Sequence, residues 1–326
     1  MTRVSALSKE ETIWLTSAAE WEDIPAEKFE IIGTDDFSGD IIARPKIGYW
    51  ADAWRRLKEN KIALVALIVL ILLIVMVCIG PAISGYSFEQ VDTSAINQKP
   101  SAEHWFGTDS LGRDLFARVW QGGRVSIMIG IVGAVVASVI GCIYGGIASY
   151  FGGIVDDIMM RIVEVLLSIP YLIIVILISV VTDSKSIGTM MLALTLTGWC
   201  GIARLVRGQM LQLKSQEYVL AANALGVSPF KTIMRHMIPN TIGIIIVAIT
   251  FDIPGYIFSE AFLSYIGLGI QPPDTSWGAL ASAAQQNFMF YPYQLLFPSL
   301  MIALTMLSFT LLGDGLRDAL DPKLRK

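Results

Sequence analysis

The sequence predicts an all-α membrane protein with six transmembrane helices. Its 326 residues are 54% apolar and only 16% charged, which is unusually apolar for a water-soluble domain. Long stretches with few or no charged residues recur along the chain, each close to the ~20 residues that a helix needs to cross a bilayer core. The predicted spans cover about 62–81, 125–149, 162–181, 187–203, 241–263 and 293–312.

Two polar segments precede the first span. Residues 1–43 contain ten Asp or Glu residues against three Lys or Arg, and they lack the apolar core of a signal peptide. We interpret them as an acidic cytoplasmic tail. Residues 44–61 are basic and contain Trp50 and Trp54, a combination typical of a helix at the inner membrane surface. Residues 62–326 then form the transmembrane domain.

The distribution of positive charge predicts the orientation. If the N-terminus lies inside, 19 of the 24 Lys and Arg residues fall on the cytoplasmic side of the six spans. Both termini and the polar loop at about 204–240 are therefore expected in the cytoplasm.

The second span carries small residues at every fourth position, so they share one helix face and allow another helix backbone to approach closely. Packing within the bundle is the simpler interpretation of this stripe. In the third span, Pro170 predicts a kink. The stripe consists of Gly133, Ala137, Gly141, Gly145 and Ser149.

The fifth span contains two carboxylates. Asp252 lies near mid-span, where a charge costs roughly 2.5–3.5 kcal/mol, so it is expected to face protein or a water-filled path. A structural role between helices and a place in a transport pathway both stay open. Glu260 is expected nearer the outer surface. In the following outer loop, Ser276 is predicted to cap a short helix that runs to Gln286.

The polar loop predicts two short helices joined by a glycine turn. Ser215 is expected to cap the first helix, and Gly226 to supply the left-handed turn that ends it. Ser228 and Pro229 are typical of the start of a second helix, which Pro239 is expected to interrupt. An ordinary connecting loop would fit this spacing equally well.

The motifs of this loop also resemble a known family. The spacing of Ala221-Ala222, Gly226 and Ile238-Pro239 resembles the EAA loop of ABC importer permeases. Leu220 before the two alanines and His236 before the proline depart from the usual pattern, and both resemble the dipeptide/oligopeptide branch. Further segments are similar to the C-type permease of that branch: FGTDSLGRDLFARVWQGGRVS, FGGIVDDIMMRIVEVLLSIP, ARLVRGQML, LSYIGLGIQPPDTSWG and GDGLRDALDP.

The resemblance implies a type I ABC importer permease bundle in a bacterial or archaeal cell (inner) membrane. The loop would be a cytoplasmic coupling helix that docks on an ATPase, with Ala222 small because that contact is close. The coupling residues would be Glu217, Ala221, Ala222, Leu225, Gly226, Pro229 and Pro239.

The family also implies the partners of the chain. These are a second homologous permease, two cytoplasmic ATPases that carry ATP and Mg, and an extracytoplasmic binding protein. No cofactor on this chain and no nucleic-acid partner are expected. Di- or oligopeptides would be the substrate, with nickel or another small solute as the alternative.

The sequence also bears on three other functional classes, namely secondary transporters, intramembrane enzymes and channels. An ion-coupled secondary transporter usually shows internal repeats, and we find none. An intramembrane enzyme lacks support because His104 and His236 lie outside the spans. The three cysteines (Cys78, Cys142 and Cys200) lie in apolar stretches and suggest no metal site. A channel is not excluded by the span count. The sequence lacks a Gly-Lys-Ser/Thr phosphate-binding loop, which predicts a non-catalytic subunit driven by partner ATPases.

Overall fold

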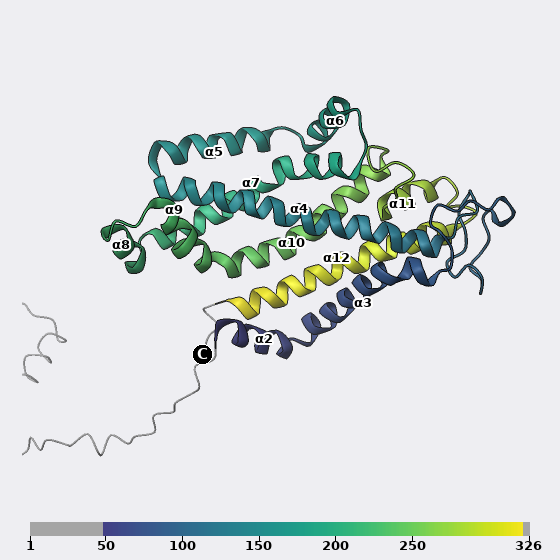
Figure 1. The fold of residues 1–326 in the computed structure, drawn as a ribbon, viewed down its shortest axis with the longest axis horizontal. Coiled ribbons are helices and arrows are strands. Elements are labelled where there is room, and N and C mark those ends of the chain that lie inside the picture. Colours follow the sequence, from purple (N-terminus) through teal and green to yellow (C-terminus); the bar gives the residue numbers. More distant parts are fainter. Residues whose placement is uncertain (1–47, 322–326) are drawn as a thin grey trace, which may run out of the picture. The chain divides into compact units, whose positions relative to one another are not determined.

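The computed structural model describes residues 48–321, so the predicted acidic tail, the start of the basic segment and Lys323, Arg325 and Lys326 lie outside the described residues. Every regular element within 48–321 is helical (Figure 1). The helices are α2 (Tyr49–Glu59), α3 (Lys61–Ile83), α4 (Leu115–Phe151), α5 (Gly153–Ser168), α6 (Tyr171–Thr182), α7 (Ile187–Lys214), α8 (Glu217–Ala224), α9 (Pro229–Thr232), α10 (Ile238–Tyr265), α11 (Trp277–Gln285) and α12 (Pro292–Leu320), with a 3-10 turn at Thr93–Ala95 and a π-helical turn at Ile233–Met237.

The predicted six-span, all-α architecture is confirmed. Five helices are long and apolar enough to cross a membrane: α3, α4, α7, α12 and the continuous helix Pro229–Tyr265, of which α10 is the main part. The pair α5 and α6 passes the same test when the two helices are counted together, and counting it as one broken span gives six.

The third span differs from its prediction, which placed one kinked helix at 162–181. The structure begins this segment at Gly153 and divides it into α5 and α6, which meet at an angle of 83°. Pro170 removes a backbone donor and disfavours helical geometry at the residue before it, and Ile169 is extended, with ψ of 124°. The proline therefore breaks the helix rather than kinking it.

Several other predicted boundaries also need correction, among them the end of the sixth span, since α12 continues beyond 312 to Leu320. Helix α4 begins ten residues before the predicted 125, because the Asp114 side chain accepts a hydrogen bond from the Ala117 N–H and caps it. Helix α7 continues beyond 203 to Lys214. Pro239 does not interrupt the last helix of the loop, because the π-helical turn before it has already shifted the hydrogen-bond register, with the Ile238 N–H donating to Ile233.

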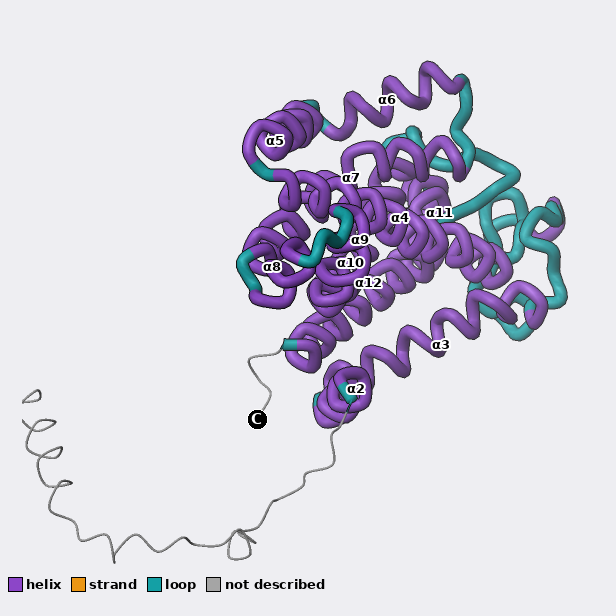
Figure 2. Tube along the Cα trace, turned by 60° about the vertical axis from the view of Figure 1, so that its left-hand side comes forward, coloured by secondary structure: helices purple, strands orange, loops and turns teal. Residues whose placement is uncertain are grey.

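Helix α4 is the centre of the bundle. It packs along α7 over much of its length and also contacts α3, α5 and α10, while α12 lies between α3 and α10 (Figures 1 and 2). The stripe of small residues makes this packing possible. Gly141 contacts the Ile202 side chain, Gly145 lies against the backbone of Ala203, and Gly133 faces the ring of Tyr256. One stripe thus faces both α7 and α10.

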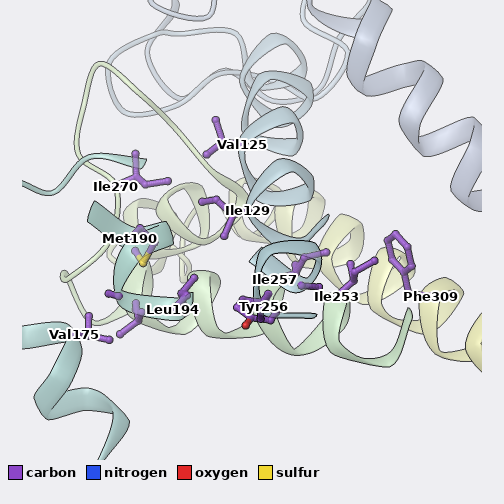
Figure 3. Close-up of a cluster of buried hydrophobic side chains, with 14 of the residues drawn as sticks. Val125, Ile129, Val175, Met190, Leu194, Ile253, Tyr256, Ile257, Ile270 and Phe309 are labelled. Atoms are coloured by element: carbon purple, nitrogen blue, oxygen red, sulfur yellow. The ribbon is translucent and has the colours of Figure 1, made fainter. Parts of the chain in front are cut away.

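The largest buried apolar cluster joins residues of six helices around this contact, namely α3, α4, α6, α7, α10 and α12 (Figure 3). Burial of such side chains contributes roughly 1.5–3 kcal/mol each and fixes α10 against α4. Its members include Val125 and Ile129 of α4, Met190 and Leu194 of α7, Ile253, Tyr256 and Ile257 of α10, and Phe309 of α12.

The connections lie at two opposite ends of the bundle. Helices α8 and α9 share one end with α2 and with the C-terminal end of α12, whereas α11 and the loop 84–114 lie at the other (Figure 1). The Tyr49 hydroxyl hydrogen-bonds the Leu320 carbonyl at 3.5 Å and so joins α2 to the end of α12. The described chain therefore starts and finishes at the end that carries α8 and α9.

Candidate coupling loop and transmembrane pocket

The loop between α7 and α10 has the predicted helix–turn–helix form. Gly226 adopts a φ of +73°, and the Val227 N–H donates to the Ala222 carbonyl at 3.1 Å to close the end of α8. Pro229 is the first residue of α9. The capping prediction for Ser215 is wrong: Gln216 precedes α8, and the Ser215 hydroxyl donates instead to the Gln212 carbonyl of α7 at 3.1 Å.

One face of α8 packs on the protein itself. Val219 is fully buried in a cluster with Met210 of α7 and with Ile233 and Met237. Ala222 lies on the same buried face, with an exposure of only 6%. The small size of Ala222 is therefore explained by packing within the chain, and the expectation that this side chain contacts a partner directly is corrected.

The opposite face of the loop carries apolar side chains into the open. Leu225 is 83% exposed and Phe230 is 70% exposed, and Leu220 is exposed beside them. We call these three residues the docking face. Exposed apolar clusters of this kind mark interaction sites on protein surfaces. Glu217, Ala221, Pro229 and Pro239 are also exposed.

Polar contacts hold the loop to the bundle. The Tyr150 hydroxyl at the end of α4 donates to Asn223 of α8 at 3.1 Å, and the Lys214 ammonium donates to the Tyr150 carbonyl at 2.7 Å. Arg207 of α7 forms a bidentate ion pair with Asp156 of α5 near the same end. These contacts join α8 to the end of α4, and they join α7 to both α4 and α5.

Tyr218 lies on α8 directly before the buried Val219 and is 40% exposed. Partial burial raises the pKa of Tyr218 above the ordinary value for tyrosine, so this side chain is neutral at pH 7. Helix α8 therefore gains no negative charge from it.

Asp252 lies in a pocket of about 290 Å³ between α6, α7 and α10. The side chain is partly exposed. The lining contains no basic residue among those that the structure describes. It consists of Tyr171, Leu194, Thr197, Gly198, Phe251, Asp252, Gly255, Tyr256 and Ser259. The structure thus places Asp252 at an opening lined by both apolar and hydroxyl-bearing side chains.

Glu260, expected near the outer surface, is fully buried. Its two carboxylate oxygens accept hydrogen bonds from Ser126 of α4 at 2.9 Å and from Ser264 of α10 at 2.8 Å. Ser126 in turn accepts a hydrogen bond from the Trp277 N–H at 3.1 Å. The carboxylate therefore joins α4, α10 and the start of α11. This role was not predictable from the sequence, because Ser126 and Glu260 lie 134 residues apart in the chain.

Helix α11 closes this end of the bundle. The Ser276 side chain accepts a hydrogen bond from the Ala279 N–H at 3.0 Å and caps the helix, which runs to Gln285 with Gln286 as its C-cap, so the predicted helix is confirmed. The fully buried Trp277 indole donates to the Val119 carbonyl of α4 at 2.8 Å. These contacts hold α11 firmly on α4.

The adjoining loop 84–114 is organised around Asp114. Its carboxylate accepts a hydrogen bond from the Ser84 hydroxyl at 2.9 Å and pairs with the buried His104 Nδ1 at 2.9 Å. Because Asp114 also caps α4, this one side chain fixes the loop to the start of the central helix. Within the described residues, no cluster of three or more His, Cys, Asp or Glu residues is suited to a metal ion.

The arrangement of a long-helix bundle with an exposed helix–turn–helix loop matches a known transporter family. Residues 137–326 match the family described as binding-protein-dependent transport system inner membrane component. The chain belongs to this family of ABC importer permeases. Residues 48–100 match the N-terminal transmembrane domain of oligopeptide transport permease C.

Curated relatives cover nearly the whole chain. It is 48% identical to the dipeptide transport system permease protein DppC of Bacillus subtilis, over 93% of this chain and 95% of the relative. Identity to the oligopeptide transport system permease protein OppC of the same organism is 45%, over 94% and 100%. A glutathione transport system permease protein, GsiD of Escherichia coli, is 40% identical over 85% and 91%.

A solved structure supports the fold. The inward-facing MetNI methionine ABC transporter has a chain that aligns with a TM-score of 0.50 and 18% identity, covering 63% of this protein and 95% of that chain. At this identity the likeness concerns the fold alone, which is that of a type I ABC importer permease.

Proposed function

We propose that the chain is one transmembrane half of an ATP-driven importer for di- or oligopeptides. A binding protein delivers the peptide on the outside, and a second, homologous permease forms the other half of the pathway. Two cytoplasmic ATPases, which bind ATP and Mg, drive transport. Support for peptides comes from the names of relatives that are 45–48% identical over more than nine-tenths of the chain.

The docking face carries the proposed link to ATP hydrolysis. Leu225 and Phe230 expose their apolar side chains on a loop whose inner face is fixed to α7 and α10. An ATPase subunit that covers the docking face would stabilise the complex by roughly 25 cal/mol for each Å² of apolar surface that it buries. Glu217, Ala221, Gly226, Pro229 and Pro239 would shape or border the contact. Ala222 would support it from within.

The test replaces the two apolar side chains by carboxylates. In the complex co-expressed with its ATPases, Leu225→Glu and Phe230→Glu should each weaken ATPase retention by about tenfold or more, because an unpaired charge would be buried at the contact. Leu111→Glu, at an exposed apolar position at the opposite end of the bundle, is the matched control and should retain the ATPases. Normal retention by both loop variants would contradict a coupling role.

The proposed orientation has its own test. Single cysteines at Leu225 and Leu111 are exposed at opposite ends of the bundle. An impermeant thiol reagent should label Leu111→Cys from outside intact cells and Leu225→Cys only after permeabilisation. Labelling of both from the same side would contradict the cytoplasmic placement of the loop and of the two termini.

The substrate is tested by uptake into vesicles that contain the complete transporter. When ATP is supplied on the side of the ATPases and the cognate binding protein on the opposite side, a labelled di- or tripeptide should accumulate on the ATPase side of the membrane. Glutathione is the second candidate because one relative is named for it, and it is assayed in parallel as a competitor. Absence of uptake of every peptide tested would contradict the proposal.

A further inference from the structure

Asp252 is an ionisable side chain without a hydrogen-bond or ion-pair partner in the described part of the chain. It lies near the middle of α10, in a helix long and apolar enough to span a membrane. Within residues 48–321 it forms no hydrogen bond and no ion pair. Carboxylates inside a membrane span are costly and mark functional sites when they face a cavity. Asp252 faces one.

The pocket beside Asp252 presents further oxygen atoms. The Tyr256 hydroxyl is buried, lines the pocket and has no hydrogen-bond partner in the part of the chain that the structure describes. Its position depends on Gly198 of α7, since a Cβ there would overlap the hydroxyl. On α10, Ser259 lies about one turn after Tyr256 and about two turns after Asp252. Its hydroxyl oxygen also lines the pocket.

The composition of the pocket defines what fits it. A carboxylate and hydroxyl oxygens accept hydrogen bonds from an ammonium group, which offers three donors and no acceptor. The described lining supplies no Lys or Arg, so a positive charge that pairs with Asp252 would come from outside this lining. The acyl chains of membrane lipids carry no ammonium group, so they do not match these hydrogen-bond acceptors. Phe251 in the lining and the exposed Phe258 nearby offer apolar area for an attached side chain.

We propose that Asp252, Tyr256 and Ser259 form a transmembrane subsite that binds the α-ammonium group of a peptide in transit. The cavity of about 290 Å³ has room for the ammonium group together with the α-carbon and side chain of a first residue, which favours a solute over the tip of one lysine from a neighbouring subunit. This inference rests on the proposed peptide importer and adds a site of substrate contact to it.

The experiment uses the complete transporter in vesicles with its binding protein. Two substrates are compared, a tripeptide with a free α-ammonium group and its des-amino analogue, each at a concentration that saturates the binding protein. Asp252→Asn should lower uptake of the free tripeptide by about tenfold, because a hydrogen bond to a charged group is lost. Uptake of the des-amino analogue should change less than twofold. Asp252→Glu should recover much of the loss.

The matched control is Asp183→Asn, an exposed carboxylate in the left-handed conformation that asparagine also adopts readily. It should transport both substrates like the wild type. Basal ATP hydrolysis and subunit composition of the Asp183→Asn complex should also match the wild type.

Each other outcome has a distinct meaning. Equal loss of both substrates in Asp252→Asn, or loss of the second permease from the complex, would overturn the subsite in favour of a structural contact. Unchanged uptake of the free tripeptide would overturn it as well. Failure of the wild-type complex to transport any peptide would instead contradict the proposed function.

Discussion

The α8–α9 loop at one end of the bundle and the site around Glu260 and Trp277 at the other place their side chains in opposite ways. At the end with α8 and α9, Leu225 and Phe230 extend into the open. At the end with α11, Trp277 is fully buried and the carboxylate of Glu260 is enclosed by serine hydroxyls. Both ends are short helices between long ones, so length and hydropathy do not distinguish them.

The difference indicates which of these two sites has its contacts completed within the described chain, although the segment after α11 also exposes Met289 and Phe290. The polar atoms around Glu260 satisfy one another, and the Trp277 indole has its partner in α4. In the α8–α9 loop, only the side chains of the inner face, such as Val219 and Ala222, are buried against the rest of the protein. A surface that leaves large apolar side chains in water is stabilised when a partner covers it.

The largest effect is expected for Glu260→Ala. It leaves the Ser126 and Ser264 hydroxyls without their partner in a buried site and opens a cavity, at a combined cost of about 3 kcal/mol or more. Thermal unfolding of the purified complex should therefore show a clearly lower midpoint. Asp252→Asn, on the same helix but partly exposed, should stay within about 0.5 kcal/mol of the wild type. Equal stability of Glu260→Ala and wild type would remove the contrast between the two ends.

The next effect separates the two faces of α8. Ala222→Glu forces a carboxylate into the buried face and should cost about 2 kcal/mol or more, seen as faster hydrogen exchange across 217–237. Leu225→Glu, on the exposed face three residues later, should leave the exchange rates of the free permease unchanged. If both variants exchange alike, the assignment of inner and outer faces is wrong.

The smallest effect concerns the turn. Gly226→Val should cost about 1–2 kcal/mol, because a β-branched residue resists a φ of +73°. No described atom lies within 4 Å of a Cβ at this position, so the cost is conformational and not a clash. Gly226→Asn, which tolerates the left-handed region, should lose only a few tenths of a kcal/mol. Hydrogen exchange of α8 and α9 measures both, and an equal loss in the two variants would point to a different cause.

Local chemistry made several features predictable. The positive φ of Gly226, the start of α9 at Pro229 and the Ser276 cap each depend on one or two neighbouring residues. The six spans follow from the length of apolar stretches, since the bilayer imposes that length. Such features survive in any tertiary arrangement.

Other features were decided by contacts between distant segments. Pro170 predicted a bend, but its 83° size depends on how α5 and α6 pack beside α4 and α7. The depth of Glu260 depends on Ser126, which lies 134 residues earlier in the chain. Sequence position places a carboxylate along a helix axis, whereas its burial depends on which helices surround that point.

The sequence by itself determined the number of spans, the helix–turn–helix form of the loop and the small-residue face of α4, because each follows from hydropathy, backbone preference or helical periodicity. Only the tertiary structure decided that Ala222 points inward while Leu225 and Phe230 point outward. It also decided that Asp252 opens to a pocket while Glu260 is enclosed. The physical reason is that a side chain's surroundings are set by residues far away in the chain, which no local pattern records.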